Sequence, residues 1–370
     1  MSVASVETSR PSGQALSPAV ADGRYLSLDA YRGLIMILLV AEGFGFGPLK
    51  NHPVFGLIAN QVDHVAWQGA VFWDLIQPAF MFMVGVAMPF AFARRIERDA
   101  GFGQNLAHVL GRSLKLIALS QLFTIVHSGR VQFGLINVLS QIAFTYFLCF
   151  LIMQLRFRWQ VAAAVLILAG HGGLFLAFPG PEGPFSKSGN VGAVIDSAIL
   201  GRNYPGLYVT INFISSTATT LFGVWTGCLM RSPRGVMEKL RILIVAALAG
   251  LAGGLVLTLV NPMVKRIWTA SFTLYSAGWV LLILAAFVWL IDVKGYRKFT
   301  FPMVVVGMNS IFAYVVSQLF HGGIYRTIGA LTGRFAFIGT LAPVAQASAT
   351  LLVIWYFCYW LYRRKIYIKV

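Results

Sequence analysis

The sequence predicts an all-α polytopic membrane protein of about ten transmembrane helices, with both termini in the cytoplasm. Of its 370 residues, 58% are hydrophobic and 11% are charged, and the mean hydropathy is +0.75. Apolar runs long enough to cross a hydrocarbon core of about 30 Å, which needs roughly 20 residues in a helix, recur along the whole chain. This composition excludes an ordinary soluble domain.

The apolar runs define the expected spans and leave little sequence outside them. Residues 1–24 are polar and have no apolar core, so we expect a disordered cytoplasmic tail ahead of a single transmembrane domain at 25–370. The long stretch at 179–207 reads as an outer loop with a short interfacial helix. The ten expected spans are 30–47, 70–93, 108–127, 132–154, 159–178, 208–230, 240–260, 271–291, 302–320 and 341–362.

The net charge of +17 follows the predicted topology. With the N-terminus inside, 21 of the 29 Lys and Arg residues fall on the inner side. This positive-inside distribution predicts that both termini lie in the cytoplasm. The basic charge is therefore explained by topology and contact with anionic lipids, and we expect no nucleic-acid partner. The outer side keeps Lys50, Arg130, Lys187, Arg202, Lys265, Arg266, Arg326 and Arg334.

The three cysteines do not suggest metal or disulfide chemistry. Cys149, Cys228 and Cys358 all lie within expected spans and form no CxxC pair. Such isolated intramembrane cysteines are typical of packing residues, and we expect no metal site.

An imidazole and a carboxylate at the start of the second span are the strongest functional signal. Ionisable groups in lipid are unfavourable, so each is a functional candidate. If residues 64–78 are helical, Trp67 and Gln68 lie one turn below His64, and Asp74 lies about 15 Å deeper. His64 and Asp74 could then not touch, and Asp74 would need partners on other helices at mid-membrane depth. The polar residues available for this are Asp29, Arg32, Glu42 and Asn309.

Several of these residues also have a purely structural interpretation. Ser27 and Asp29 suit an N-cap and a first-turn acid of the first helix, and Arg32 suits a snorkelling interface residue. Asn309 could join helices by hydrogen bonds. Trp268 could anchor an aromatic belt at the membrane surface.

Two segments resemble the heparan-α-glucosaminide N-acetyltransferase family of transmembrane acyltransferases. LSLDAYRGLIMILL at 26–39 and HVAWQGAVFWDLIQPAF at 64–80 carry the family pattern D-x-x-RG followed by H-x-x-W-x-G-x-x-x-x-D-x-x-x-P. The resemblance continues in TATTLFGVWTG, KRIWTASFTLYSAGW and VVGMNSIFAYV, and is nearer to a bacterial branch than to the lysosomal enzyme. It therefore implies the inner (cytoplasmic) membrane of a bacterium as the location. The pattern falls on Asp29, Arg32, Gly33, His64, Trp67, Gly69, Asp74 and Pro78.

The resemblance implies an acyltransferase-like bundle that moves an acetyl group from cytosolic acetyl-CoA to an extracytoplasmic acceptor, an amino sugar or another glycan. It implies that His64 is the acyl acceptor or the general base, with Asp74 ordering the polar network around it. Two departures bear on the acceptor and the CoA contacts: Glu42 replaces a usual asparagine, and Gln141 replaces a usual arginine. The residues expected to bind substrate or acetyl-CoA are Asp29, Arg32, Glu42, Trp67, Gln68, Trp268 and Asn309.

Two other functions remain open from the sequence. Ten helices with buried charges also fit a transporter or flippase for a sugar or small organic acid. An intact fold without catalysis could instead serve as an assembly partner in an envelope polysaccharide pathway. As partners we expect the lipid bilayer, acetyl-CoA and a glycan or amino-sugar acceptor. The sequence leaves open whether the protein forms a homodimer.

Overall fold

The computed structural model describes residues 25–97, 100–201 and 206–368, so the tail expected at 1–24 lies outside the described residues. Within these ranges the regular structure is entirely helical, with thirteen α-helices and no strand. The helices are α1 Leu26–Val40, α2 Gly56–Gln61, α3 Ile76–Ile96, α4 Phe102–Ser128, α5 Val138–Ile152, α6 Phe157–Ala177, α7 Val191–Leu200, α8 Asn212–Arg231, α9 Val236–Leu257, α10 Ala270–Phe287, α11 Phe301–Met308, α12 Ser310–Thr332 and α13 Ala342–Arg363.

Each of the ten predicted spans contains a helix, and the chain is a multi-pass membrane protein. Seven helical segments of the described residues are long and apolar enough to cross a membrane. One of the seven, Ser310–Arg363, joins α12 and α13 through the 3₁₀ segment Gly333–Leu341. By contrast, α1 and α5 have 15 residues each. The count of ten spans and the cytoplasmic termini stay predictions.

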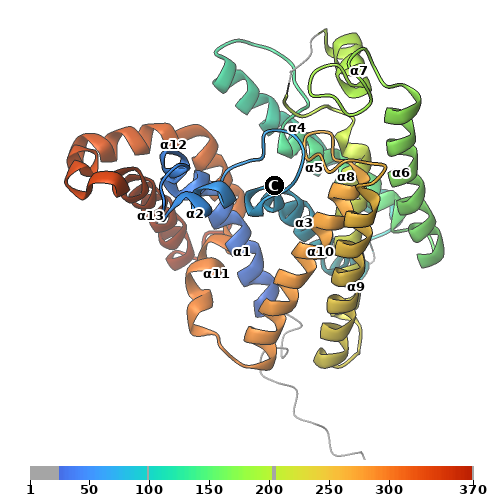
Figure 1. Cartoon of the computed structure of the whole chain (residues 1–370). Coiled ribbons are helices and arrows are strands. Elements are labelled where there is room, and N and C mark those ends of the chain that lie inside the picture. Colours follow the sequence, from blue (N-terminus) through green and yellow to red (C-terminus); the bar gives the residue numbers. More distant parts are fainter. Residues whose placement is uncertain (1–24, 98–99, 202–205, 369–370) are drawn as a thin grey trace, which may run out of the picture.

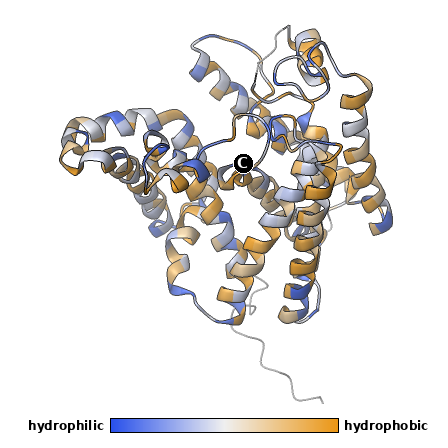
Figure 2. Cartoon of the chain, viewed as in Figure 1, coloured by the Kyte–Doolittle hydropathy of each residue, from blue (hydrophilic) through white to orange (hydrophobic). Residues whose placement is uncertain are grey.

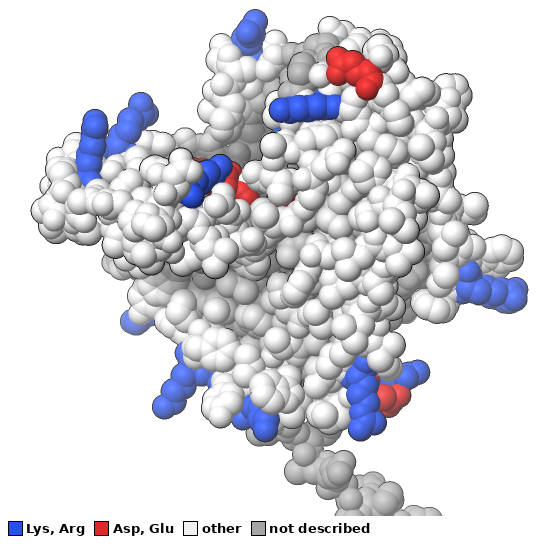
Figure 3. Space-filling model, in the orientation of Figure 1, with Lys and Arg blue, Asp and Glu red and all other residues white. Residues whose placement is uncertain are grey.

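The helices stand side by side as one bundle (Figure 1). α9 and α10 run next to each other, α3 and α8 lie at the centre, and α12 and α13 lie on the opposite flank. The short helix α7 confirms the helix predicted within the 179–207 segment. Apolar residues predominate along the helices (Figure 2), and the charged side chains visible in Figure 3 gather mostly toward the upper and lower ends.

Glycines allow α3 and α8 to pack backbone against backbone. A Cβ added at Gly85 would lie 1.9 Å from the Thr220 carbonyl oxygen, and one at Gly223 would lie 2.0 Å from the Phe82 carbonyl oxygen. Small residues at such positions let membrane helices approach closely, and van der Waals contact then holds them together. Asp74 lies two residues before α3 begins, so this contact fixes the position of its carboxylate along the axis of the bundle.

Buried amides also join α3 to its neighbours. Gln77 Nε2 donates to Gln141 Oε1 at 2.6 Å, and Gln141 Nε2 donates to Ser216 Oγ at 2.9 Å. These two hydrogen bonds therefore link α3, α5 and α8. They also satisfy the buried amides, as polar groups in an apolar interior require. Gln141, at the position where the family pattern has arginine, is part of this link.

We expect Gly223→Ala to destabilise the protein, because the new methyl group must push α3 and α8 apart. Overpacking of this kind typically costs about 1–3 kcal/mol. The measurement is thermal unfolding in detergent, with Gly170→Ala in α6 as the control, since a Cβ at Gly170 meets no atom within 4 Å. Equal unfolding temperatures for the two variants would contradict the packing argument.

Candidate active site

The segment before α3 is not helical. Residues 62–71 form an irregular loop, and helical structure starts only with the 3₁₀ turn Phe72–Leu75. Gly69 has a positive φ of 104° and donates its N–H to the Met263 carbonyl at 2.8 Å. The N–H groups of the loop bond to Asp74 and to the distant Met263 carbonyl instead of forming helical hydrogen bonds, so the helix considered for 64–78 does not extend over residues 64–71. Trp67 and Gln68 therefore do not lie one turn below His64.

Asp74 organises this loop through its carboxylate. Its Oδ2 accepts hydrogen bonds from the backbone N–H groups of Val71 at 3.2 Å and Val65 at 3.4 Å. N–H groups at and before a helix start have no partner within the helix, and an acidic side chain in the first turn can accept from them. These two hydrogen bonds hold the loop against the start of α3.

The folded loop brings His64 against Asp74. His64 Nδ1 lies 2.7 Å from Asp74 Oδ1, so the prediction that these two residues cannot touch is wrong. Lys265 Nζ lies 3.3 Å from Asp74 Oδ1 and 3.3 Å from His64 Nδ1. Asp74 is in the first turn of the span Phe72–Ile96 and not at its middle, which also corrects its expected depth.

The three side chains differ sharply in burial. The side chain of Asp74 is 1% exposed and that of Lys265 is 5% exposed, whereas His64 is 39% exposed. A buried carboxylate needs a counter-charge, and the Lys265 ammonium group supplies it. With Asp74 accepting the Nδ1 proton, the imidazole presents its Nε2 lone pair away from the carboxylate. This group of His64, Asp74 and Lys265 is called the triad below.

A second carboxylate fixes the backbone of His64. Asp63 Oδ1 accepts a hydrogen bond from the His64 N–H at 2.7 Å, and Asp63 Oδ2 forms an ion pair with Lys50. The hydrogen bond from Lys50 holds the pKa of Asp63 below its ordinary value. The backbone N–H and the imidazole of His64 are therefore each bonded to a carboxylate.

The tryptophans predicted to bind substrate have mainly structural contacts. Trp67 Nε1 donates to the Phe185 carbonyl at 2.8 Å, which ties the loop to the segment before α7. Trp268 is fully buried, with Nε1 donating to Thr219 Oγ1 at 3.2 Å. The aromatic-belt interpretation of Trp268 is therefore wrong, since a belt residue faces the membrane surface. Gln68 is exposed and lies on the same loop as His64.

The residues proposed as partners of Asp74 on helix 1 bond elsewhere. Arg32 forms an ion pair with Asp29 at 3.1 Å. Ser27 does not cap α1, because its Oγ donates to Asp292 Oδ2 at 2.5 Å from inside the helix. Asp29 and Arg32 were two of four candidate partners of Asp74, and its partners in the structure are His64 and Lys265 instead.

Glu42 and Asn309 likewise bond away from Asp74. Glu42 Oε2 lies 3.2 Å from His321 Nδ1. Asn309 separates α11 from α12 and is completely buried. Its Nδ2 donates to the Ile366 carbonyl at 3.1 Å and its Oδ1 accepts from the Ile368 N–H at 3.0 Å, so it ties the C-terminal segment to the bundle. The substrate-binding roles of Glu42 and Asn309 stay predictions.

Sequence reasoning missed Lys265 as a member of the site. It was counted only as one of the cations on the outer side. The signal for it was the block KRIWTASF, which begins with Lys265 and carries part of the family resemblance.

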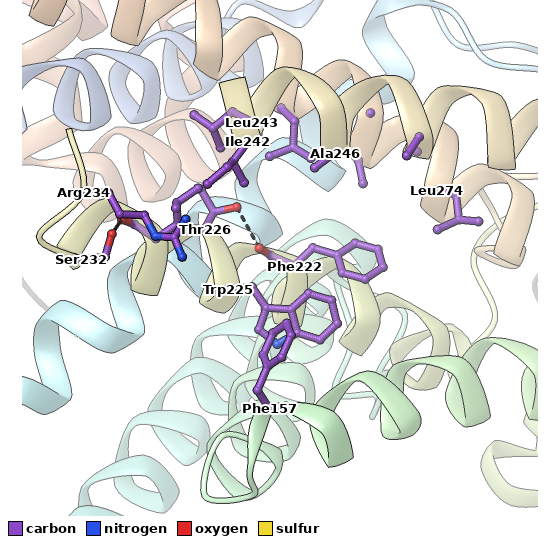
Figure 4. Close-up of a pocket in the computed structure, with 16 residues that line it drawn as sticks. Phe157, Phe222, Trp225, Thr226, Ser232, Arg234, Ile242, Leu243, Ala246 and Leu274 are labelled. Atoms are coloured by element: carbon purple, nitrogen blue, oxygen red, sulfur yellow. Dashed lines mark hydrogen bonds between the residues drawn. The ribbon is translucent and has the colours of Figure 1, made fainter. Parts of the chain in front are cut away.

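An apolar cavity of about 710 Å³ lies away from the triad, between α6, α8, α9 and α10. Its wall includes Phe157, Trp225 and Leu274, and its polar groups, among them Thr226 and Arg234, sit toward one end (Figure 4). No triad residue lines it. Among the residues that line it there is no His, Cys, Asp, Glu or Lys, so the triad is the candidate active site.

The amino-terminal part of the chain matches a known family. Residues 24–180 match the model for the catalytic region of heparan-alpha-glucosaminide N-acetyltransferase, and this segment contains His64 and Asp74. The chain is 23% identical to the human protein of that name over 94% of its length, and 23% identical to the mouse protein over 79%. It spans 60% and 53% of the length of these two relatives.

We expect Lys265→Met to unfold at a clearly lower temperature in detergent, because it leaves the Asp74 carboxylate buried without a counter-charge. Breaking a buried pair in this way costs about 3–5 kcal/mol. The double variant Asp74→Asn/Lys265→Met removes both charges and should recover much of the loss. The control is Lys50→Met, which breaks an exposed pair worth about 1 kcal/mol or less. If Lys265→Met behaves like Lys50→Met, Lys265 does not neutralise Asp74.

Proposed function

We propose that this chain, whose residues 24–180 match the model for the heparan-alpha-glucosaminide N-acetyltransferase catalytic region, is a membrane acetyltransferase. It takes the acetyl group of cytosolic acetyl-CoA and passes it to an amine or hydroxyl group of an extracytoplasmic acceptor, an amino sugar or another glycan. The observation that carries the proposal is the triad. A buried carboxylate and ammonium hold one partly exposed imidazole, His64, in a single orientation.

The chemistry of the triad suits acyl transfer. A carboxylate that accepts the Nδ1 proton of histidine selects the tautomer in which Nε2 carries the lone pair, and it stabilises the imidazolium that forms when Nε2 takes a proton. Imidazole in this state can act as a general base or as a nucleophile. Lys265 keeps Asp74 ionised and in place, so the orientation of the His64 imidazole does not depend on solvent.

Two routes use the same nitrogen. In direct transfer, Nε2 of His64 takes the proton of the acceptor amine or hydroxyl as that group attacks the thioester carbonyl, and the CoA thiolate leaves. In a relay, Nε2 itself attacks the thioester carbonyl, a C–N bond forms as the C–S bond breaks, and the CoA thiolate leaves. The acceptor amine or hydroxyl then attacks the acetyl carbonyl, the C–N bond breaks, and the acceptor's proton passes to the freed Nε2. The relay suits a donor and an acceptor that approach from opposite sides of the membrane.

We expect the purified protein in detergent to bind acetyl-CoA and to release free CoA slowly, with water as the acceptor. His64→Ala should lower the release by about 10²- to 10⁴-fold, the usual contribution of a general base, and leave acetyl-CoA binding unchanged. The control is His52→Ala, because His52 Nδ1 accepts only from the backbone N–H groups of its own turn, Val54 and Phe55.

The same experiment separates the routes and the rival function. An acetyl group found on His64 by mass spectrometry after rapid quenching supports the relay, and CoA release without it supports direct transfer. A transporter has no use for CoA, so the absence of both acetyl-CoA binding and CoA release in the unmodified protein would refute the acetyltransferase proposal.

A further inference from the structure

The apolar cavity between α6, α8, α9 and α10 has one wall of aromatic side chains (Figure 4). The rings of Phe157 and Phe222 each lie 5.4 Å from the ring of Trp225, measured between centroids. Trp225 Nε1 donates to Gln160 Oε1 at 2.8 Å, so the one polar atom of the indole already has its partner. The wall therefore presents hydrocarbon to the cavity, and a cavity with such a lining accepts an apolar ligand more readily than water.

The opposite wall is hollow because α9 packs closely on α10 and barely touches α8. A Cβ added at Gly254 would lie 2.5 Å from the backbone nitrogen of Tyr275, so the backbones of α9 and α10 nearly meet. On the side that faces α6 and α8, small residues of α9 line the cavity and leave its volume unfilled. These residues are Ala246, Ala249 and Gly250.

The cavity runs from the connection between α8 and α9 into the depth of the membrane. Its lining begins at Ser232 and Arg234, ahead of α9, and reaches Gly250. From Val236, where α9 begins, to Gly250 the helix rises roughly 21 Å at 1.5 Å per residue. This is somewhat more than half of a hydrocarbon core of about 30 Å. An acyl chain whose headgroup lies at the membrane surface extends over a similar depth.

The polar end of the cavity carries an excess of positive charge. Residues 231–241 contain four Lys or Arg residues and one Glu. Arg234 lines the cavity and is half exposed, and its Nη1 donates to Glu238 Oε1 at 2.7 Å. This exposed pair is weak and uses one of the five N–H donors of the guanidinium. Arg231 and Arg241 are also exposed and directly precede residues of the lining.

We propose that this cavity binds one anionic phospholipid, with an acyl chain between α6, α8 and α9 and its phosphate at Arg234. A basic pocket between membrane helices suits a charged lipid headgroup, and a guanidinium matches phosphate oxygens as a planar fork. The surplus of cations favours a lipid with net negative charge over a zwitterionic one. The inference concerns a region apart from the triad and does not rest on the proposed function.

The test is native mass spectrometry of the protein in dodecyl maltoside with dioleoyl phosphatidylglycerol or dioleoyl phosphatidylcholine, which have the same acyl chains. We expect one tightly bound phosphatidylglycerol per chain, held about 10-fold more tightly than phosphatidylcholine, as for a hydrogen bond to a charged group. Arg234→Gln should remove this preference. The control is Arg363→Gln, which removes a cation at the end of α13, where Arg363 Nη1 donates to the Tyr359 hydroxyl.

A second pair of variants tests the part of the site that holds the acyl chain. Ala246→Trp places an indole in the cavity, so both lipids should bind at least about 10-fold more weakly, since each displaced methylene contributes about fourfold. Leu248→Trp, on the same helix at a side chain that is 55% exposed and outside the lining, should leave both affinities unchanged. If Ala246→Trp does not fold, the comparison of Arg234→Gln with Arg363→Gln decides alone.

Three results would overturn the inference. The first is equal affinity of the unmodified protein for the two lipids, and the second is an equal effect of the two Trp variants or of the two Gln variants. The third is a dimer in detergent that Ala246→Trp dissociates and Leu248→Trp does not, because the cavity would then belong to an interface between two copies of the chain.

Discussion

The pairing of Asp74 with Lys265 is the constraint on which the candidate site depends. Asp74 is almost fully buried at the start of a membrane-spanning segment, where an unpaired carboxylate would be strongly unfavourable. Its two oxygens serve different partners: Oδ1 meets His64 and Lys265, and Oδ2 accepts from the backbone of the loop before α3. One carboxylate therefore fixes both the shape of the loop and the orientation of the imidazole.

The bundle provides a rigid base for this carboxylate. The close contact of α3 with α8 at Gly85 and Gly223 fixes the axial position of α3. The hydrogen bonds of Gln77 and Gln141 join the same helix to α5 and α8. A site whose supporting residues are locked by packing and hydrogen bonds keeps its geometry when substrate arrives, which catalysis requires.

The exposed and the buried parts of the site have separate tasks. The charges of Asp74 and Lys265 cancel in the interior, so the buried part is a neutral support. His64 lies at the surface of this support, and its Nε2 points away from the carboxylate that binds Nδ1. That exposed nitrogen is the atom of the site that a substrate can reach.

Composition and residue type alone determined the helical membrane class and marked His64 and Asp74 as candidate site residues. Both follow from local physics: apolar runs must cross lipid as helices, and ionisable groups are rarely placed there without a role. The loop at 62–71 and the partner Lys265 were decided by the tertiary structure. The N–H groups of that loop bond to Asp74 and Met263, and Lys265 lies 191 residues beyond Asp74 in the sequence. Helical spacing could not reveal these contacts, because it describes only neighbours along one chain segment, and the packing of α3, α8 and α10 brought the distant residues together.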